Sequence, residues 1–131
     1  MKFLTFIRHS ESYRESPPPP ALMEAMGKFV QRSLKEGTLV DTGGLLPSKE
    51  GVRVRLADGK ITVTDGPFSE TKEVIGGYWI IQVRSREEAI EWAKRIPILG
   101  DGIIEVRGIQ EMSDFPQDVQ KAAEGFEKLP H

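Results

Sequence analysis

The sequence contains no cysteine among its 131 residues. Disulfide bonds, a thiol nucleophile and a thiolate metal site are therefore excluded. It has only two histidines, His9 and His131, which lie near opposite ends of the chain. A tight zinc site needs several nitrogen or sulfur ligands in one place. We accordingly expect no metal, the alternative being a carboxylate Mg²⁺ or Ca²⁺ site near Asp65, Glu70 and Glu73. The sequence also has no Walker glycine–lysine loop and no Gly-x-Gly-x-x-Gly opening a helix, so we expect no cofactor.

The sequence also lacks a strong charge of one sign and any long apolar run. Its 18 Lys and Arg residues nearly balance its 20 Asp and Glu residues, for a net charge of −2. Without a basic stripe interleaved with aromatic side chains, we expect no nucleic-acid binding. Its apolar runs fall far short of the roughly 20 residues that span a bilayer, so we expect no membrane span. The first run already meets a charge at Arg8, too soon for a signal peptide, and we expect a cytoplasmic protein.

The first half of the chain predicts a strand, a helix and a second strand. Residues 3–9 are apolar on both sides of the pleat, which is typical of a buried strand. A run of four prolines then leads into a helix that ends at Gly37. Residues 38–46 predict the second strand, in which Gly43 and Gly44 indicate a bulge or a close backbone approach. The apolar stripe predicted for the helix consists of Leu22, Met26, Phe29, Val30 and Leu34.

Residues 52–64 carry the clearest local pattern in the chain. Apolar and polar residues alternate on both sides of an Asp-Gly dipeptide, which is typical of a tight two-residue hairpin turn. Counting outward from the turn pairs Leu56 with Ile61 and Val54 with Val63, so the apolar side chains share one side of the hairpin. The other side of the hairpin is formed by Arg53, Arg55, Thr62 and Thr64.

The second half of the chain repeats the order of strand, helix and strand. Residues 78–83 follow two glycines and predict a strand that is apolar on both sides. Ser85, with Glu88 three residues later, forms a capping box for a helix that stops before Pro97. Residues 103–106 predict the last strand.

Two strand–helix–strand halves joined by a hairpin predict an α+β fold of the ferredoxin-like kind, with both helices on one face of an antiparallel sheet. We assign residues 1–109 to this domain and residues 110–131 to a C-terminal extension, with a short helix over 117–126. The two helices leave the second face of the sheet uncovered, although that face also carries apolar side chains. We therefore expect a homodimer whose sheets pack face to face.

One segment gathers side chains that carry chemistry. Asp65 ends the predicted hairpin, a Gly-Pro turn follows, and Glu70, Lys72 and Glu73 come soon after it. On a loop at the mouth of a pocket, Asp65 and Glu70 are candidate catalytic acids or bases, because neighbouring carboxylates favour retention of a proton. Lys72 and Glu73 are ligand-binding candidates, with Lys72 as the partner of an anion. The alternative is a plain turn followed by a solvated charged stretch.

Three residues outside this charged cluster complete the candidate site. His9 is a third acid–base candidate, and the alternative is an exposed or hydrogen-bonded loop histidine. Ser48 and Phe68 are candidates for ligand binding, and the alternative for Phe68 is a plug at the sheet edge. We expect the pocket itself between the sheet and the first helix.

The same residues carry a resemblance to a known family. Asp65-Gly66-Pro67-Phe68, continued by Glu70-Thr71-Lys72-Glu73, resembles the signature of the DGPF-domain proteins of the YCII-related family. The resemblance covers about residues 1–109. It includes the Gly43-Gly44-Leu45-Leu46-Pro47-Ser48 segment, the Val-Arg-Val hairpin, Gly76-Gly77-Tyr78 and Glu88-Ala89-Ile90-Glu91-Trp92-Ala93.

This resemblance implies a dimeric α/β barrel in a small bacterial protein, sometimes encoded beside an extracytoplasmic-function sigma factor. In YCII proteins at large, a histidine on the first helix and an aspartate after the second strand converge in a pocket. Here Met26 lies near the position of that histidine, and Asp41 lies in the region of the aspartate. The chain therefore departs from the family pattern at the histidine.

Two functions remain open at this point. The first is the binding of a small organic molecule in a dimeric α/β barrel, with a cofactor-independent lyase, isomerase or hydrolase activity. The second is a regulatory or interaction module without turnover, associated with a sigma factor by family analogy, in which the segment around Asp65 serves structure.

Overall fold

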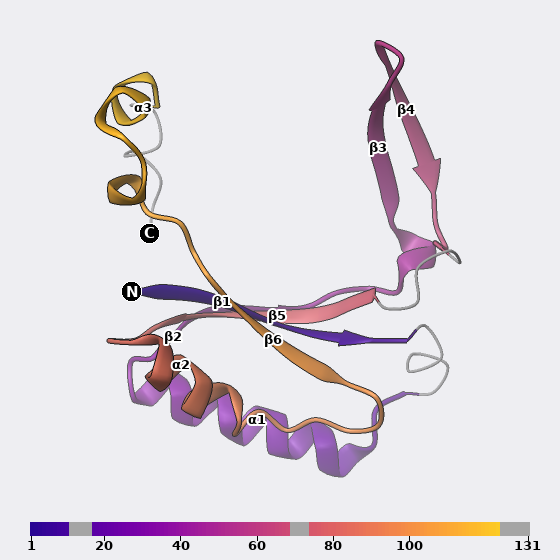
Figure 1. The fold of residues 1–131 in the computed structure, drawn as a ribbon. Helices are drawn as coiled ribbons and strands as arrows, with labels where there is room; N and C mark the ends of the chain where they lie inside the picture. The colour runs from indigo at the N-terminus through magenta and orange to yellow at the C-terminus, as the bar shows by residue number, and fades with distance from the viewer. Residues whose placement is uncertain (11–16, 69–73, 124–131) are drawn as a thin grey trace.

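The computed structural model describes residues 1–10, 17–68 and 74–123. The strands and helices follow one another in an order that repeats strand, helix and strand around a central hairpin (Figure 1). These elements are β1 (Lys2–His9), α1 (Pro20–Lys35), β2 (Leu39–Gly44), the 3₁₀ helix η2 (Ser48–Glu50), β3 (Val52–Ala57), β4 (Lys60–Asp65), β5 (Val74–Gln82), α2 (Arg86–Ala93), β6 (Ile103–Gly108), the 3₁₀ helix η3 (Met112–Asp114) and α3 (Gln117–Ala122).

The body of the molecule is a four-stranded antiparallel sheet in the order β2-β5-β1-β6. Helices α1 and α2 lie together on one face of this sheet (Figure 1). The predicted α+β class is confirmed, and the strand order is compatible with a ferredoxin-like arrangement. Within the described ranges, strands β3 and β4 pair with each other alone, in a separate two-stranded sheet.

The core fills the space between the sheet and the helices. Trp92 of α2 is almost fully buried, and its ring lies 4.9 Å from that of Phe29 on α1. Its indole Nε1 donates a hydrogen bond to the Ser33 hydroxyl at 3.1 Å. Ser33 therefore takes the buried place at the end of the α1 stripe, and Leu34, predicted to belong to that stripe, is 55% exposed. The space in which we expected a pocket is thus occupied by packed side chains.

The predicted hairpin register is confirmed. Leu56 pairs with Ile61, and Val54 pairs with Val63. At the tip, Asp58 has φ 51° and the glycine after it has φ 74°, as a primed two-residue turn requires. We call this element, residues 52–65, the hairpin arm.

Strands β2 and β5 differ from their predicted boundaries. Strand β2 is shorter than predicted, and its bulge falls between Leu39 and Asp41 rather than at the glycines. Strand β5 begins at Val74, because the two glycines before Tyr78 continue its pairing instead of preceding it. The cap of α2 is as predicted at Ser85, whose hydroxyl accepts a hydrogen bond from the Glu88 amide at 3.1 Å.

Beyond β6 the chain forms a C-terminal arm, residues 109–123, which carries η3 and α3. The hairpin arm and the C-terminal arm rise from opposite ends of the sheet, both on the side that the helices do not cover (Figure 1). The helix predicted over 117–126 begins at Gln117 as expected, and residues 124–126 lie outside the described part of the chain. No helix in the described ranges combines the length and hydropathy that a membrane crossing requires.

Candidate functional site

The first half of the segment around Asp65 forms a tight corner at the base of the hairpin arm. The Gly66 amide donates to the Gly51 carbonyl at 2.9 Å, and the Phe68 amide donates to the Ser48 hydroxyl at 3.4 Å. A Cβ at Gly66 would overlap with the Ser48 carbonyl oxygen, so only glycine fits there. Ser48 and Phe68, two predicted site residues, are thus brought together. We call residues 48–51 and 66–68 the hairpin corner.

An arginine of the hairpin arm packs against this corner. The guanidinium carbon of Arg53 lies 3.9 Å from the centroid of the Phe68 ring, in cation–π geometry. Phe68 is half-buried, so the ring joins the arm to the turn that follows it. The described part of the segment is therefore occupied with contacts that hold the hairpin arm in place.

The charged candidates of this segment are only partly described. Asp65 is the last residue of β4, pairs with Val52 and is exposed. Glu70, Lys72 and Glu73 lie outside the described residues. The acid–base roles proposed for Asp65 and Glu70 therefore stay predictions.

His9 is placed differently from the loop histidine considered as an alternative. It is the last residue of β1, pairs with Val74 of β5 and is 2% exposed. Its ring Nδ1 lies 2.8 Å from the carbonyl oxygen of Ser10. His9 is therefore a buried residue at the end of the strand predicted over residues 3–9, and not a loop residue.

A second candidate region is the sheet face opposite the helices, which we call the open face. The strand registers align its side chains in rows that cross all four strands. Apolar and aromatic residues of the two central strands form its floor, and the two edge strands carry charged side chains and one glycine. The floor consists of Leu4, Phe6, Tyr78 and Ile80, and the edges carry Asp41 and Gly43 on β2 and Glu105 and Arg107 on β6.

At the β2 edge of the open face, a tyrosine and an aspartate are joined. The Tyr78 hydroxyl donates a hydrogen bond to Asp41 Oδ2 at 3.4 Å, and the Thr42 amide donates to Asp41 Oδ1 at 2.9 Å. Tyr78 pairs directly with Gly43, where a Cβ would come within 3.0 Å of the tyrosine ring. At Gly43 it is thus a side chain that approaches closely, rather than the backbone that the sequence predicts, because glycine has no Cβ. This absence leaves room for the ring to reach Asp41.

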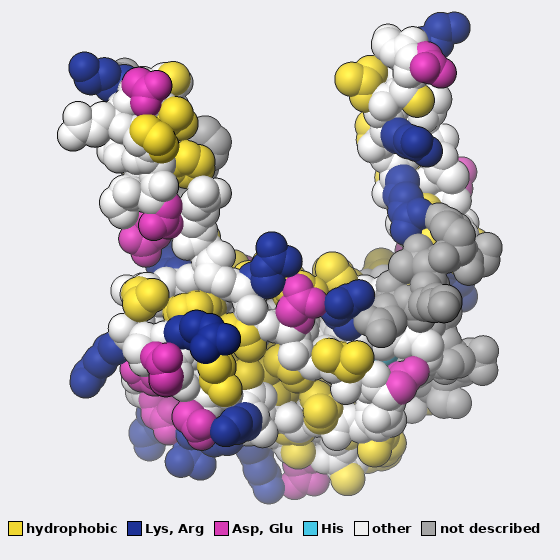
Figure 2. Space-filling view, in the orientation of Figure 1, with side chains coloured by type: hydrophobic (Ala, Val, Ile, Leu, Met, Phe, Trp, Pro, Cys, Tyr) yellow, Lys and Arg dark blue, Asp and Glu magenta, His cyan; other side chains and the backbone are white. Residues whose placement is uncertain are grey.

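At the β6 edge, charged side chains form a short network. Arg8 donates to Glu105 Oε1 at 3.0 Å, and Arg107 donates to Glu105 Oε2 at 3.4 Å. In Figure 2, cationic and anionic side chains alternate on the surface that lies between the two arms, and hydrophobic side chains are visible on the body below them. The open face thus combines an apolar floor with an acid at one edge and ion pairs at the other.

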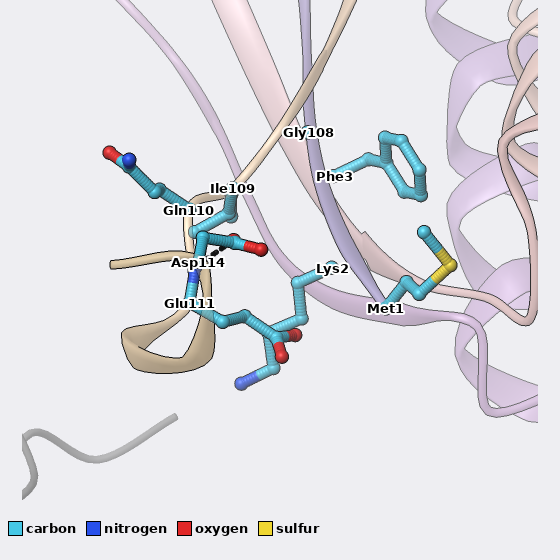
Figure 3. A pocket seen from close by; sticks show the side chains of 8 residues that line it. All are labelled: Met1, Lys2, Phe3, Gly108, Ile109, Gln110, Glu111 and Asp114. Atoms are coloured by element: carbon cyan, nitrogen blue, oxygen red, sulfur yellow. Dashed lines mark hydrogen bonds between the residues drawn. The ribbon is translucent and has the colours of Figure 1, made fainter. Parts of the chain in front are cut away.

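A cavity of about 600 Å³ lies where the C-terminal arm leaves the sheet. Lys2 and Glu111 extend toward the same end of it, and the Phe3 ring lies on the other side (Figure 3). Asp114 also lines the cavity, and its Oδ2 accepts a hydrogen bond from the Glu111 amide at 2.7 Å. Within the described ranges, no three His, Cys, Asp or Glu side chains gather so as to hold a metal ion.

Comparison with known families places this chain in one of them. The sequence pattern of the YCII-related domain matches residues 1–113. The chain belongs to the YCII-related family. It is also similar to an uncharacterised protein of Rhizobium meliloti (strain 1021), with 38% identity over 73 residues. That match covers 56% of this chain and 59% of the relative, so the chain spans less than two thirds of the relative's length.

Within this YCII-related domain, the family resemblance points to the region of Asp41, but the local sequence pattern does not pair it with Tyr78. The signal for this pair lies in the two glycines of the second strand, which predict a bulge or a close backbone approach. A glycine opposite an aromatic residue on a neighbouring strand leaves space for the ring to lie across it. The missing step was the register between β2 and β5, which aligns Gly43 with Tyr78.

Proposed function

We propose that this YCII-related protein binds a small organic molecule on the open face of its sheet, in a space closed by a second copy of the chain. The observation that carries the proposal is the Tyr78–Asp41 hydrogen bond at the edge of an apolar floor. Small-molecule sites typically combine apolar walls with a few convergent polar groups. The family membership is consistent with this proposal.

The chemistry of the edge residues indicates the ligand class. The Asp41 carboxylate accepts hydrogen bonds, and the Tyr78 hydroxyl can donate one and accept another. A ligand with an apolar body over Leu4 and Ile80 and a hydroxyl group directed at Asp41 would match both the apolar floor and the polar edge. If the bound molecule reacts, Asp41 as base and Tyr78 as acid support a cofactor-independent proton transfer, of the kind that isomerases, lyases and hydrolases use.

The second copy is needed because one copy leaves the site open to water. Asp41 is exposed in the single chain, and hydrogen bonds and proton transfers are more effective where water is excluded. The apolar floor and the ion pairs of the β6 edge form one continuous face that the chain's own helices cannot reach (Figure 1). A second sheet stacked on this face would cover the floor.

Saturation-transfer NMR with phenol and benzoate tests the site. Phenol has an apolar ring and a hydroxyl donor, whereas benzoate places a carboxylate beside Asp41. We expect phenol to bind better than benzoate, and Asp41→Asn and Tyr78→Phe to weaken phenol binding by about 10-fold, because each loses one directed hydrogen bond. Asp58→Asn at the hairpin tip is the matched control, since asparagine is also favoured at that turn position. Phenol binding that is insensitive to both site variants would reject the proposal.

One observation favours a second candidate function, an interaction module without turnover. The backbone amides of Gly66 and Phe68 donate hydrogen bonds within the hairpin corner, and the neighbouring Asp65 is exposed. A structural role for the segment fits these contacts. The two candidates separate experimentally, because an interaction module predicts no saturable phenol signal at the open face while the protein still associates with a macromolecular partner.

A further inference from the structure

The hairpin arm presents an apolar side that the described residues of its own chain leave exposed. Its large apolar side chains are 57% to 68% exposed, although each strand pattern is typical of a half-buried hairpin. The cross-strand pairs align them on one side of the arm. They are Val52, Val54, Leu56, Ile61 and Val63.

An arm of this kind is poorly stabilised alone. An isolated two-stranded hairpin is marginally stable in water, and this one forms a sheet separate from the body. Its base is anchored at the hairpin corner, where Arg53 lies over Phe68, but its tip has no such support in the described residues. An apolar side of this kind generally marks an interaction surface.

We infer that the apolar side of the hairpin arm clasps a second copy of this chain. The inference rests on the second copy invoked in the proposed function, and adds the surface by which that copy is held. The arm rises on the same side as the open face (Figure 1), so a copy that covers the open face must lie beside the arm. The clasp is therefore continuous with the face-to-face contact.

The arm is long enough to pack along the side of the second copy, rather than to touch only the edge of its sheet. Strands of six residues extend about 20 Å, whereas stacked sheets lie about 10 Å apart. The arm therefore reaches past the plane between the two sheets and along the flank of the other copy. In a two-fold pair, each copy gives one arm and receives one.

The charges of the two arms are also complementary. The side of the hairpin arm opposite the apolar residues carries Arg53, Arg55 and Lys60. The C-terminal arm carries an excess of acid, with Glu111, Asp114 and Asp118 against Lys121. Figure 2 shows both arms standing free of each other across the open face, with hydrophobic side chains visible on each. In a face-to-face pair, the arms of each copy extend toward the other copy, and these opposite charges attract.

Replacing Leu56 and Ile61 by threonine tests the clasp. Leu56→Thr with Ile61→Thr keeps the strand propensity of the paired positions and removes the apolar contact. Sedimentation equilibrium should show a dimer for the wild type and a dissociation constant raised by about 100-fold for the double variant, because both arms of the pair lose their contact. The matched control, Thr62→Ser with Thr64→Ser on the opposite side, should leave the dissociation constant unchanged.

Hydrogen–deuterium exchange of the wild type gives an independent measurement. Amides of residues 52–65 should exchange slowly at concentrations where the dimer dominates and quickly after dilution, whereas amides of β1 should stay protected throughout. A wild-type dimer that the double variant does not weaken would reject the clasp and leave the proposed function standing. A wild-type monomer at micromolar concentration would reject both the clasp and the closure of the open face by a second copy.

Discussion

The ring of Tyr78 lies across the backbone of Gly43, its partner on the neighbouring strand, with Cε1 3.0 Å from where a Cβ would stand. The absence of that side chain lets the tyrosine hydroxyl reach Asp41 Oδ2 at 3.4 Å. One glycine in the second strand therefore positions the polar group at the edge of the open face. The site proposed here depends on this relationship.

Gly43→Ala should displace the Tyr78 ring and separate its hydroxyl from Asp41. We expect phenol binding to weaken by about 10-fold, as in Tyr78→Phe, because the same hydrogen bond is lost. Gly44→Ala is the matched control, since nothing lies within 4 Å of a Cβ at that position. The measurement is the phenol titration, together with the NMR spectrum of isotope-labelled tyrosine. Equal phenol affinity in the two alanine variants would contradict the positioning role of Gly43.

Ser33→Ala should destabilise the fold without touching the open face. The Trp92 indole N–H is buried and donates to the Ser33 hydroxyl, so its partner would be lost in the core. We expect the free energy of unfolding to fall by about 1–3 kcal/mol in a urea titration. Ser113→Ala, at an exposed position on the C-terminal arm, should change it by less than about 0.5 kcal/mol. A stable Ser33→Ala variant would indicate that Trp92 finds another acceptor.

Gly66→Ala and Gly27→Ala should shift stability in opposite directions. A Cβ at Gly66 overlaps with the Ser48 carbonyl, so the hairpin corner must move, at a cost we place at about 2 kcal/mol or more. Gly27 lies within α1 with nothing near its Cβ position, and alanine there should stabilise the helix by about 1 kcal/mol. Thermal unfolding of both variants checks the pair. A Gly66→Ala variant as stable as the wild type would show that the corner adapts easily.

Much of the fold was predictable because its signals are local. The Asp-Gly turn between two alternating strands fixed the hairpin register, with Leu56 opposite Ile61. The Ser85 cap and the glycine after α1 likewise act within a few residues of themselves. Such features need no knowledge of distant parts of the chain, and the predicted positions agree with the structure.

The candidate site was harder to predict because its geometry depends on contacts between distant segments. Asp41 and Tyr78 are 37 positions apart, and only the register of β2 on β5 brings them together. His9 lies at the end of the predicted strand, but its burial likewise depends on a distant segment, because it pairs with Val74 of β5. Ser33 is buried where Leu34 was predicted, and its hydroxyl accepts from the Trp92 indole, a partner 59 positions away that hydropathy does not reveal.

The most direct test of the central claim is a crystal structure of the protein with phenol. The account predicts a phenol ring over Leu4 and Ile80 with its hydroxyl at Asp41, beneath the sheet of a second copy. Phenol bound instead in the cavity beside Lys2 and Glu111, or an open face that contacts only solvent, would contradict it.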